Sequence, residues 1–187
     1  MKLLWLDTET TGLLPYKHDI IQMSGIVEIA GEVQEEFDYT LAPINIADIQ
    51  QSALDINGRT RHEILQFPDA RQQLNNMCRL LDKYVTRTAK GDNFILAGYN
   101  VTFDQDFLKN LFKKTGTVGV QGYFAYKVFD VYTLVFMLTY LDKIPTLENM
   151  KLTTMCAHFN IALDAHDSMN DIRATRELFL KLCEYIK

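Results

Sequence analysis

The sequence has no excess of basic residues. Its 187 residues include 19 Lys and Arg against 24 Asp and Glu, which gives a formal net charge of −5. A protein that holds nucleic acid mainly through a broad basic surface would carry the opposite balance, so that mode of binding is disfavoured. Binding through divalent metal ions stays open, because the charge of a carboxylate cluster is counted here without its metal.

Long apolar runs and paired cysteines are also lacking. Only Leu3 to Leu6 are continuously apolar near the start, which is too short for the apolar region of a signal peptide, and Asp7 ends the run. No segment approaches the roughly 20 apolar residues of a membrane-spanning helix. Cys78, Cys156 and Cys183 are widely spaced and show no metal-binding pattern, so we expect small core residues. We therefore expect a reduced, cytoplasmic setting and no membrane partner.

The sequence contains no internal repeat, low-complexity tract or linker rich in Pro, Gly and Ser. Its length is that of one ordinary domain, and 48% hydrophobic with 23% charged residues is a typical globular composition. We therefore expect a single domain over residues 1–187.

The spacing of apolar residues predicts an α/β domain with a mixed sheet. Alternation and short apolar runs predict strands at residues 2–7, 19–30, 36–41, 94–98 and 126–129, the third on the sheet edge. The second strand alternates apolar and polar residues and should be half-buried. Helical spacing predicts helices at residues 70–85, 102–112 (capped by Thr102), 131–141 (mostly buried), 152–159 and from about Asp167 to Ile186. Strands first, and then helices alternating with strands, are typical of α/β folds.

Two acids follow the first apolar run. Asp7 and Glu9 stand two residues apart in Trp-Leu-Asp-Thr-Glu-Thr-Thr-Gly, so on a strand their side chains project to one side. Like charges this close repel unless a cation lies between them. One alternative is that they are exposed acids that merely close a strand. Another is a phosphatase of the haloacid-dehalogenase type. The first strand of those enzymes ends in Asp-x-Asp, whereas the second acid here is Glu9, so the match is imperfect.

A second acidic cluster, Asn100-Val-Thr-Phe-Asp104, follows the strand at 94–98 and enters a helix. Asp104 would lie in the first helical turn, where the helix dipole favours a carboxylate. A capping Thr102 with Asp104 complementing the dipole would also explain this segment alone.

A third cluster runs from His166 to Asp171. His166 would lie in the loop before the last helix and Asp171 in its first turns, with Asp167 or Ser168 as the N-cap. A lone loop histidine is usually a surface residue. It is less often so when an aspartate follows five residues later in a chain with two other acidic clusters.

Together the clusters supply four carboxylates and one histidine. Mg²⁺ and Mn²⁺ prefer such oxygen ligands, and two ions about 4 Å apart can hold the attacking and leaving oxygens of a phosphodiester. Histidine, with an ordinary pKa near 6.5, suits a base that accepts the proton of the attacking water at neutral pH. The candidate catalytic residues are Asp7, Glu9, Asp104, His166 and Asp171.

The three motifs, in this order, resemble those of the DnaQ-like 3′–5′ exonucleases, and the histidine matches the DEDDh branch. The resemblance implies a ribonuclease H-like fold, a five-stranded mixed β-sheet flanked by α-helices. It also implies release of nucleoside 5′-monophosphates from the 3′ end of single-stranded nucleic acid. DNA is favoured as substrate, RNA trimming is the alternative, and a polymerase is a possible partner.

The resemblance also implies roles for residues. Asp7, Glu9 and Asp171 would bind a first metal ion, Asp7 and Asp104 a second, and His166 would be the general base. Asp130 would support the site without binding metal. Residues implied to contact the terminal nucleotide are Thr10, Thr11, Gly12, Leu13, Asn100 and Phe103.

A small basic cluster, Arg59, Arg61 and His62, separates the first two motifs. It is either a solvated turn or a patch that steers phosphates. A non-catalytic nucleic-acid-binding module remains an alternative for the whole chain, although such a module would be expected to have lost a ligand.

Overall fold

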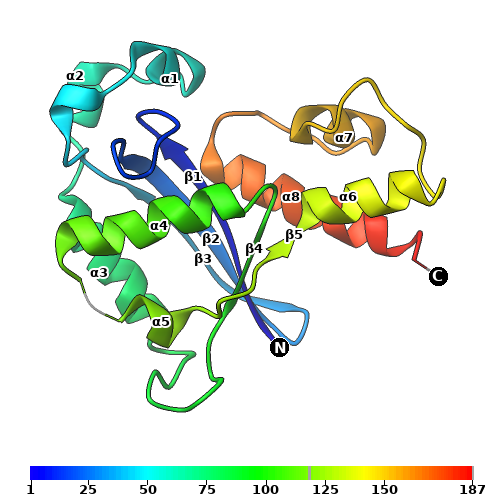
Figure 1. The fold of residues 1–187 in the computed structure, drawn as a ribbon, viewed down its shortest axis with the longest axis horizontal. Coiled ribbons are helices and arrows are strands. Elements are labelled where there is room, and N and C mark those ends of the chain that lie inside the picture. The colour runs from blue at the N-terminus through cyan, green and yellow to red at the C-terminus, as the bar shows by residue number, and fades with distance from the viewer. Residues whose placement is uncertain (118, 187) are drawn as a thin grey trace.

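A five-stranded mixed sheet organises the computed structural model, which describes residues 1–117 and 119–186 (Figure 1). The spatial order is β3-β2-β1-β4-β5; β1, β2 and β3 pair antiparallel, whereas β4 lies parallel to β1 and β5. The α/β fold with a mixed sheet is therefore confirmed. The strands are β1 (Lys2–Thr10), β2 (Ile20–Ile29), β3 (Glu32–Thr40), β4 (Ile95–Gly98) and β5 (Phe129–Asp130).

Helices cover both faces of the sheet (Figure 1). They are α1 (Gln51–Ile56), α2 (Arg61–Ile64), α3 (Ala70–Leu81), α4 (Thr102–Thr115), α5 (Val120–Tyr123), α6 (Val131–Tyr140), α7 (Leu152–His158) and α8 (Ser168–Cys183), with a 3₁₀ turn at Ile46–Asp48. The five longest match the predicted helices. The sequence did not predict α1, α2 and α5, because four to six residues are too few to show helical spacing. Among the described residues, no helix combines the length and apolar content needed to cross a bilayer.

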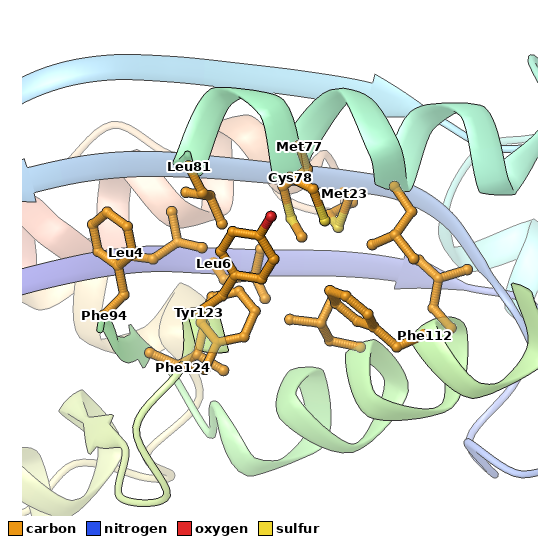
Figure 2. Packing of buried hydrophobic residues seen from close by; sticks show 14 of the residues in the cluster. Leu4, Leu6, Met23, Met77, Cys78, Leu81, Phe94, Phe112, Tyr123 and Phe124 are labelled. Carbon is orange, nitrogen blue, oxygen red and sulfur yellow. The ribbon is translucent and has the colours of Figure 1, made fainter. Parts of the chain in front are cut away.

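The central strand β1 sends alternate side chains into two cores. Leu4 and Leu6 pack with α3 and α4 (Figure 2), whereas Leu3 and Trp5 pack with α6 and α8. Because side chains alternate along a strand, Asp7 continues the second series and Thr8 the first. The alternation along β1 therefore determines the face of the sheet to which each of its polar side chains projects.

The structure corrects the predicted burial of two elements. Helix α6 buries only Val131, Val135 and Leu138, and its other face exposes aromatic residues such as Phe136. Nearly every position of α6 is apolar, so its spacing could not reveal a single buried face. Strand β2, predicted to be half-buried, is buried on both faces from Ile20 to Glu28, because α8 covers the polar side chains as well.

Several details at the ends of the predicted elements are also wrong: α3 ends at Leu81 rather than at residue 85, and β3 begins at Glu32 rather than at residue 36. The N-cap of α4 is Val101, without a side-chain hydrogen bond, because the chain turns at Asn100 (φ 58°) and the helix begins at Thr102 itself. The fifth strand is only Phe129–Asp130. Ile186 lies beyond α8 and is exposed, and Cys183 is only half-buried. Fraying and short pairing at element ends leave little signal in a sequence.

Candidate active site

The site forms where β1 extends past its neighbour β4. Pairing between them stops at Trp5 and Ala97, so among the described residues no strand pairs with the rest of β1 on that side. The chain leaves β4 at Gly98, where a Cβ atom would lie 2.8 Å from the Leu6 carbonyl oxygen. Only glycine allows this close crossing, which brings the N-terminus of α4 beside the end of β1.

Three carboxylates converge at this end. Asp7, Glu9 and Asp171 each offer one oxygen, and these oxygens all lie within 4.8 Å of one another. One Asp171 oxygen accepts a hydrogen bond from the His166 backbone N–H (3.3 Å), whereas the other is buried and has no hydrogen-bond partner among the described residues. A buried carboxylate oxygen without a donor is costly. The donor set therefore fits a divalent cation that prefers oxygen ligands.

The fourth predicted ligand, Asp104, lies next to this group without belonging to it. Asp104 is buried in the first turn of α4 and accepts a hydrogen bond from Thr8 Oγ1 at 2.7 Å. Its charge acts on both Asp7 and Glu9. The structure thus brings three predicted metal ligands into one group and places the fourth beside it.

Burial raises the pKa of Asp7, Glu9, Asp104 and Asp171, and the charges of neighbouring acids add to the rise. Burial is the largest cause of the rise for Asp7, whose pKa lies well above its usual range. The charges of Asp104, Asp171 and Glu9 raise this pKa further. Burial, followed by the charge of Asp171, raises the pKa of Glu9 to about 8. The pKa of Asp104 rises to about 7 and that of Asp171 to about 6, again mainly through burial. The cluster is therefore unstable as bare carboxylates, and a bound cation would reverse this effect.

His166 lies in the exposed loop before α8, in a left-handed backbone conformation (φ 71°). Its side chain makes no hydrogen bond to the described residues. Asp167 caps α8 by accepting from the Asn170 backbone N–H at 3.0 Å, which settles the choice between Asp167 and Ser168.

A polar network that the sequence did not reveal fixes this end of α8 to the sheet. Gln22 donates to Asp167 Oδ2 (3.0 Å) and to Asp38 Oδ1 (3.0 Å). The hydroxyls of Ser24 and Ser168 lie 2.6 Å apart. The alternating polar residues of β2 are its only signal in the sequence, where they predict no more than a half-buried strand.

The turn after β1 is held by its own hydrogen bonds. Thr10 Oγ1 donates to the Gly12 carbonyl (2.8 Å), and Thr11 exchanges two bonds with Asp19. A Cβ atom on Gly12 would lie 2.6 Å from the His18 ring. Both threonine hydroxyls are used internally, and the Thr10 and Thr11 carbonyls accept from Asn57 and Gln50, so this turn offers a ligand chiefly the Leu13 side chain, which is 74% exposed.

The turn after β4 is held by Asp130. Its Oδ1 accepts from the backbone N–H groups of Asn100 (2.9 Å) and Tyr132 (3.0 Å), so one carboxylate fixes both the turn and the start of α6. Asn100 is exposed, whereas Phe103 is half-buried against Phe107, with ring centroids 4.7 Å apart.

In the basic cluster of Arg59, Arg61 and His62, the two arginines have different partners. Arg59 pairs with Glu63 (2.7 Å), and its charge partly offsets the rise in the pKa of Glu9. Arg61 instead donates to the Ile46 carbonyl at 2.7 Å. Arg59 is thus the member of the cluster whose charge acts on the acidic site.

Comparisons with known proteins agree with this architecture. Residues 4–179 match the family model described as exonuclease. The chain is 27% identical over 179 residues to the PolC-type DNA polymerase III of Oceanobacillus iheyensis and 28% identical over 177 residues to that of Halalkalibacterium halodurans. These matches cover 95% and 94% of this chain but only 11% of each polymerase.

Solved structures show the same fold. Exonuclease I of E. coli, in complex with an oligonucleotide, superposes with a TM-score of 0.79 at 21% identity, covering 98% of this chain and 40% of that one. A moderately thermophilic exonuclease I from Methylocaldum szegediense gives a TM-score of 0.76 at 19% identity, with 99% and 42% covered. The predicted ribonuclease H-like fold is therefore confirmed. Because the family model spans nearly the whole chain, the protein belongs to the exonuclease family, as its three motifs predict.

Proposed function

We propose that the protein removes nucleotides from the 3′ end of single-stranded nucleic acid, with DNA favoured over RNA, and releases nucleoside 5′-monophosphates. The observation that carries this proposal is the convergence of Asp7, Glu9 and Asp171, with oxygens within 4.8 Å of one another and one Asp171 oxygen lacking a donor. A site enclosed by two short turns suits a strand terminus and needs no long basic groove. This agrees with the net charge of −5.

The proposed cofactors are two divalent ions, Mg²⁺ or Mn²⁺. Asp7, Glu9 and Asp171 would hold the first ion, and Asp104, with Asp7 between the two, would hold the second. When bound, the ions supply charge neutralisation at the phosphodiester and lower the pKa of water.

The remaining roles belong to side chains and backbone. His166 accepts the proton of the attacking water; its exposed loop leaves the imidazole accessible, and its backbone N–H already holds Asp171. The Thr10, Thr11 and Gly12 backbone and the Leu13 side chain surround the terminal nucleotide. Asn100 and Phe103 line the opposite wall, with Asp130 holding Asn100 in place.

The substrate and partner proposals draw on the relatives. The solved exonuclease I structures include complexes with single-stranded DNA, which supports DNA as substrate. The curated matches are polymerases, which supports work beside a polymerase. Residues 1–187 would act as a single exonuclease domain in either setting.

The test uses matched 5′-labelled DNA and RNA oligonucleotides with Mg²⁺, Mn²⁺ or EDTA, resolved on a sequencing gel. The proposal predicts a ladder that shortens from the 3′ end, is absent in EDTA and forms faster on DNA. Faster trimming of RNA than of DNA would identify RNA as the preferred substrate. Intact oligonucleotides under every metal condition would refute the proposed activity, and preferential hydrolysis of a small phosphomonoester would favour the phosphatase alternative.

A further inference from the structure

A hollow of about 580 Å³ adjoins the candidate active site at the end of β4. It opens beside Asn100, which it shares with the proposed nucleotide pocket. No other residue of this hollow belongs to the three motifs or to the acidic cluster. Its walls are Tyr99, Asn100, Tyr132, Met150, Lys151 and Leu152.

Specific contacts hold these walls in place. The Tyr99 hydroxyl donates to the Met150 carbonyl and so ties the segment before α7 to the end of β4. Asp130 binds the backbone N–H groups of Asn100 and Tyr132 together, as described above. The Lys151 backbone N–H donates to Asn149 Oδ1 at 2.9 Å. The hollow is thus built by elements distant in sequence that meet at the edge of the active site.

The chemistry of the hollow combines aromatic rings with one cation. The Tyr99 and Tyr132 rings lie 5.8 Å apart at 90°, and Tyr132 is 41% exposed. Lys151 is exposed, and no carboxylate lies within ion-pairing distance of its ammonium group among the described residues. Aromatic side chains that stack on bases, with cations that meet phosphates, are the usual means of binding single-stranded nucleic acid.

We infer that this hollow binds the part of the substrate strand directly upstream of the 3′-terminal nucleotide. One base stacks on Tyr132, and Lys151 contacts a neighbouring backbone phosphate. This inference rests on the proposed function, because the strand is the one whose 3′ end reaches the acidic cluster. It also explains how a chain with a net negative charge retains a strand beyond its last nucleotide.

The decisive test compares a long substrate with one that has no upstream base or phosphate. The long substrate is a ten-residue thymidine oligonucleotide, and the short one is the 4-nitrophenyl ester of thymidine 5′-monophosphate. Tyr132→Ala and Lys151→Gln should each lower kcat/KM on the oligonucleotide by about tenfold, as expected from the loss of one stacked base or one phosphate contact. Hydrolysis of the short ester should stay within about twofold of wild type. Tyr132→Phe, which keeps the aromatic ring, should retain most of the wild-type kcat/KM on the oligonucleotide.

Matched controls separate the hollow from general surface effects. Tyr140→Ala removes an exposed tyrosine of the same helix, and Lys143→Gln removes an exposed lysine that follows this helix; neither lines the hollow. Both should behave as wild type on both substrates. An equal loss on both substrates for Tyr132→Ala, or no loss on either, would overturn the inference.

Binding of a fluorescent thymidine oligonucleotide in Ca²⁺, followed by anisotropy, separates failure of the inference from failure of the proposed function. Weaker binding by Tyr132→Ala and Lys151→Gln supports strand binding in the hollow even if the protein cleaves no oligonucleotide. In that case the proposed activity fails and the inference stands. Unchanged binding by both variants overturns the inference whatever the activity.

Discussion

The two halves of β1, Leu3 to Leu6 and Asp7 to Thr10, have different roles although they form one continuous strand. From Leu3 to Leu6 every side chain is fully buried and apolar, and both faces of the strand are covered by helices. From Asp7 onward the same alternation places carboxylates on one side and threonines on the other, where β4 no longer pairs. The first half stabilises the sheet. The second half places like charges together at a cost that a bound cation or protonation offsets, so stability and function can be separated by mutating neighbouring residues.

The largest effect is expected from Asp7→Asn, which removes the carboxylate shared by both proposed metal positions. Turnover of a 3′-labelled oligonucleotide should fall to background. Because the substitution also removes one of the mutually repelling charges, the metal-free variant should melt at a higher temperature than wild type at pH 8. An active Asp7→Asn protein would refute the site, and a lower melting temperature would refute the repulsion.

His166→Ala should lower kcat by about 10²- to 10⁴-fold, the usual contribution of a general base. The hydrogen bond from His166 to the acidic cluster comes from its backbone N–H, which alanine keeps, and its side chain acts on Asp171 only through its charge. Calorimetric titration with Mn²⁺ should therefore give wild-type affinity. Loss of Mn²⁺ binding would show that the imidazole is a ligand and not a base.

Trp5→Ala tests the other half of β1. Trp5 is completely buried, its rings pack on Phe129 and Phe179, and its indole N–H donates to Glu28 (3.1 Å). Its truncation should lower the free energy of unfolding by about 3–5 kcal/mol, measured by urea denaturation. At temperatures where the variant stays folded, its metal affinity should be retained; loss of affinity in a folded variant would mean that the two halves are not separable.

The metal-free protein should become less stable as the pH rises from about 5 to 8.5. The folded-state pKa values of Glu9, Asp104 and Asp171, at about 8, 7 and 6, lie above the ordinary value near 4. In this range the folded state holds protons that the unfolded state has released, so the free energy of unfolding falls with increasing pH. Below about pH 4 both states are protonated and this penalty disappears.

Adding Mn²⁺ should therefore raise the melting temperature more at pH 8 than at pH 6. Differential scanning fluorimetry in EDTA and in Mn²⁺ measures both trends. The double variant Asp7→Asn, Glu9→Gln should show a flatter pH dependence. A metal-free wild type that gains stability toward pH 8 would contradict the origin assigned to the raised pKa values.

The smallest effect is expected from Thr8→Val, which removes the hydroxyl donor to Asp104 and keeps the volume of the side chain. That hydrogen bond lowers the pKa of Asp104, so its loss should raise this pKa further. The acidic limb of the pH–rate profile should move to higher pH, and activity should fall by a few-fold at pH 7 and recover near pH 9. A loss that is equal at all pH values would point to a packing defect.

The sequence predicted the layout of this fold from two kinds of signal. Strand alternation and helical spacing located β1, β2, β3, β4 and the longer helices, and the three acidic motifs located the end of the sheet where they meet. Helix α6 shows the limit, because a segment that is apolar in nearly every position does not indicate which face is buried.

The structure brings the predicted residues Asp7, Glu9 and Asp171 together, whereas the sequence did not indicate the residues that surround them. Polar residues in β2, such as Gln22 and Ser24, look solvated in a sequence, yet they hold the start of α8 through contacts about 145 positions away in the chain. Such contacts depend on which helix covers which face of the sheet. The pair of Lys114 with the buried Asp19, at 2.7 Å, is another contact between distant segments that the sequence does not indicate.

The most direct test of the central claim is a crystal structure of the protein with Mn²⁺ and thymidine 5′-monophosphate, with the metal located by anomalous scattering. The account predicts a strong Mn²⁺ peak among the carboxylate oxygens of Asp7, Glu9 and Asp171, with the nucleotide phosphate beside it. Mn²⁺ bound elsewhere at saturating concentration, or an acidic cluster that stays without metal, would contradict it.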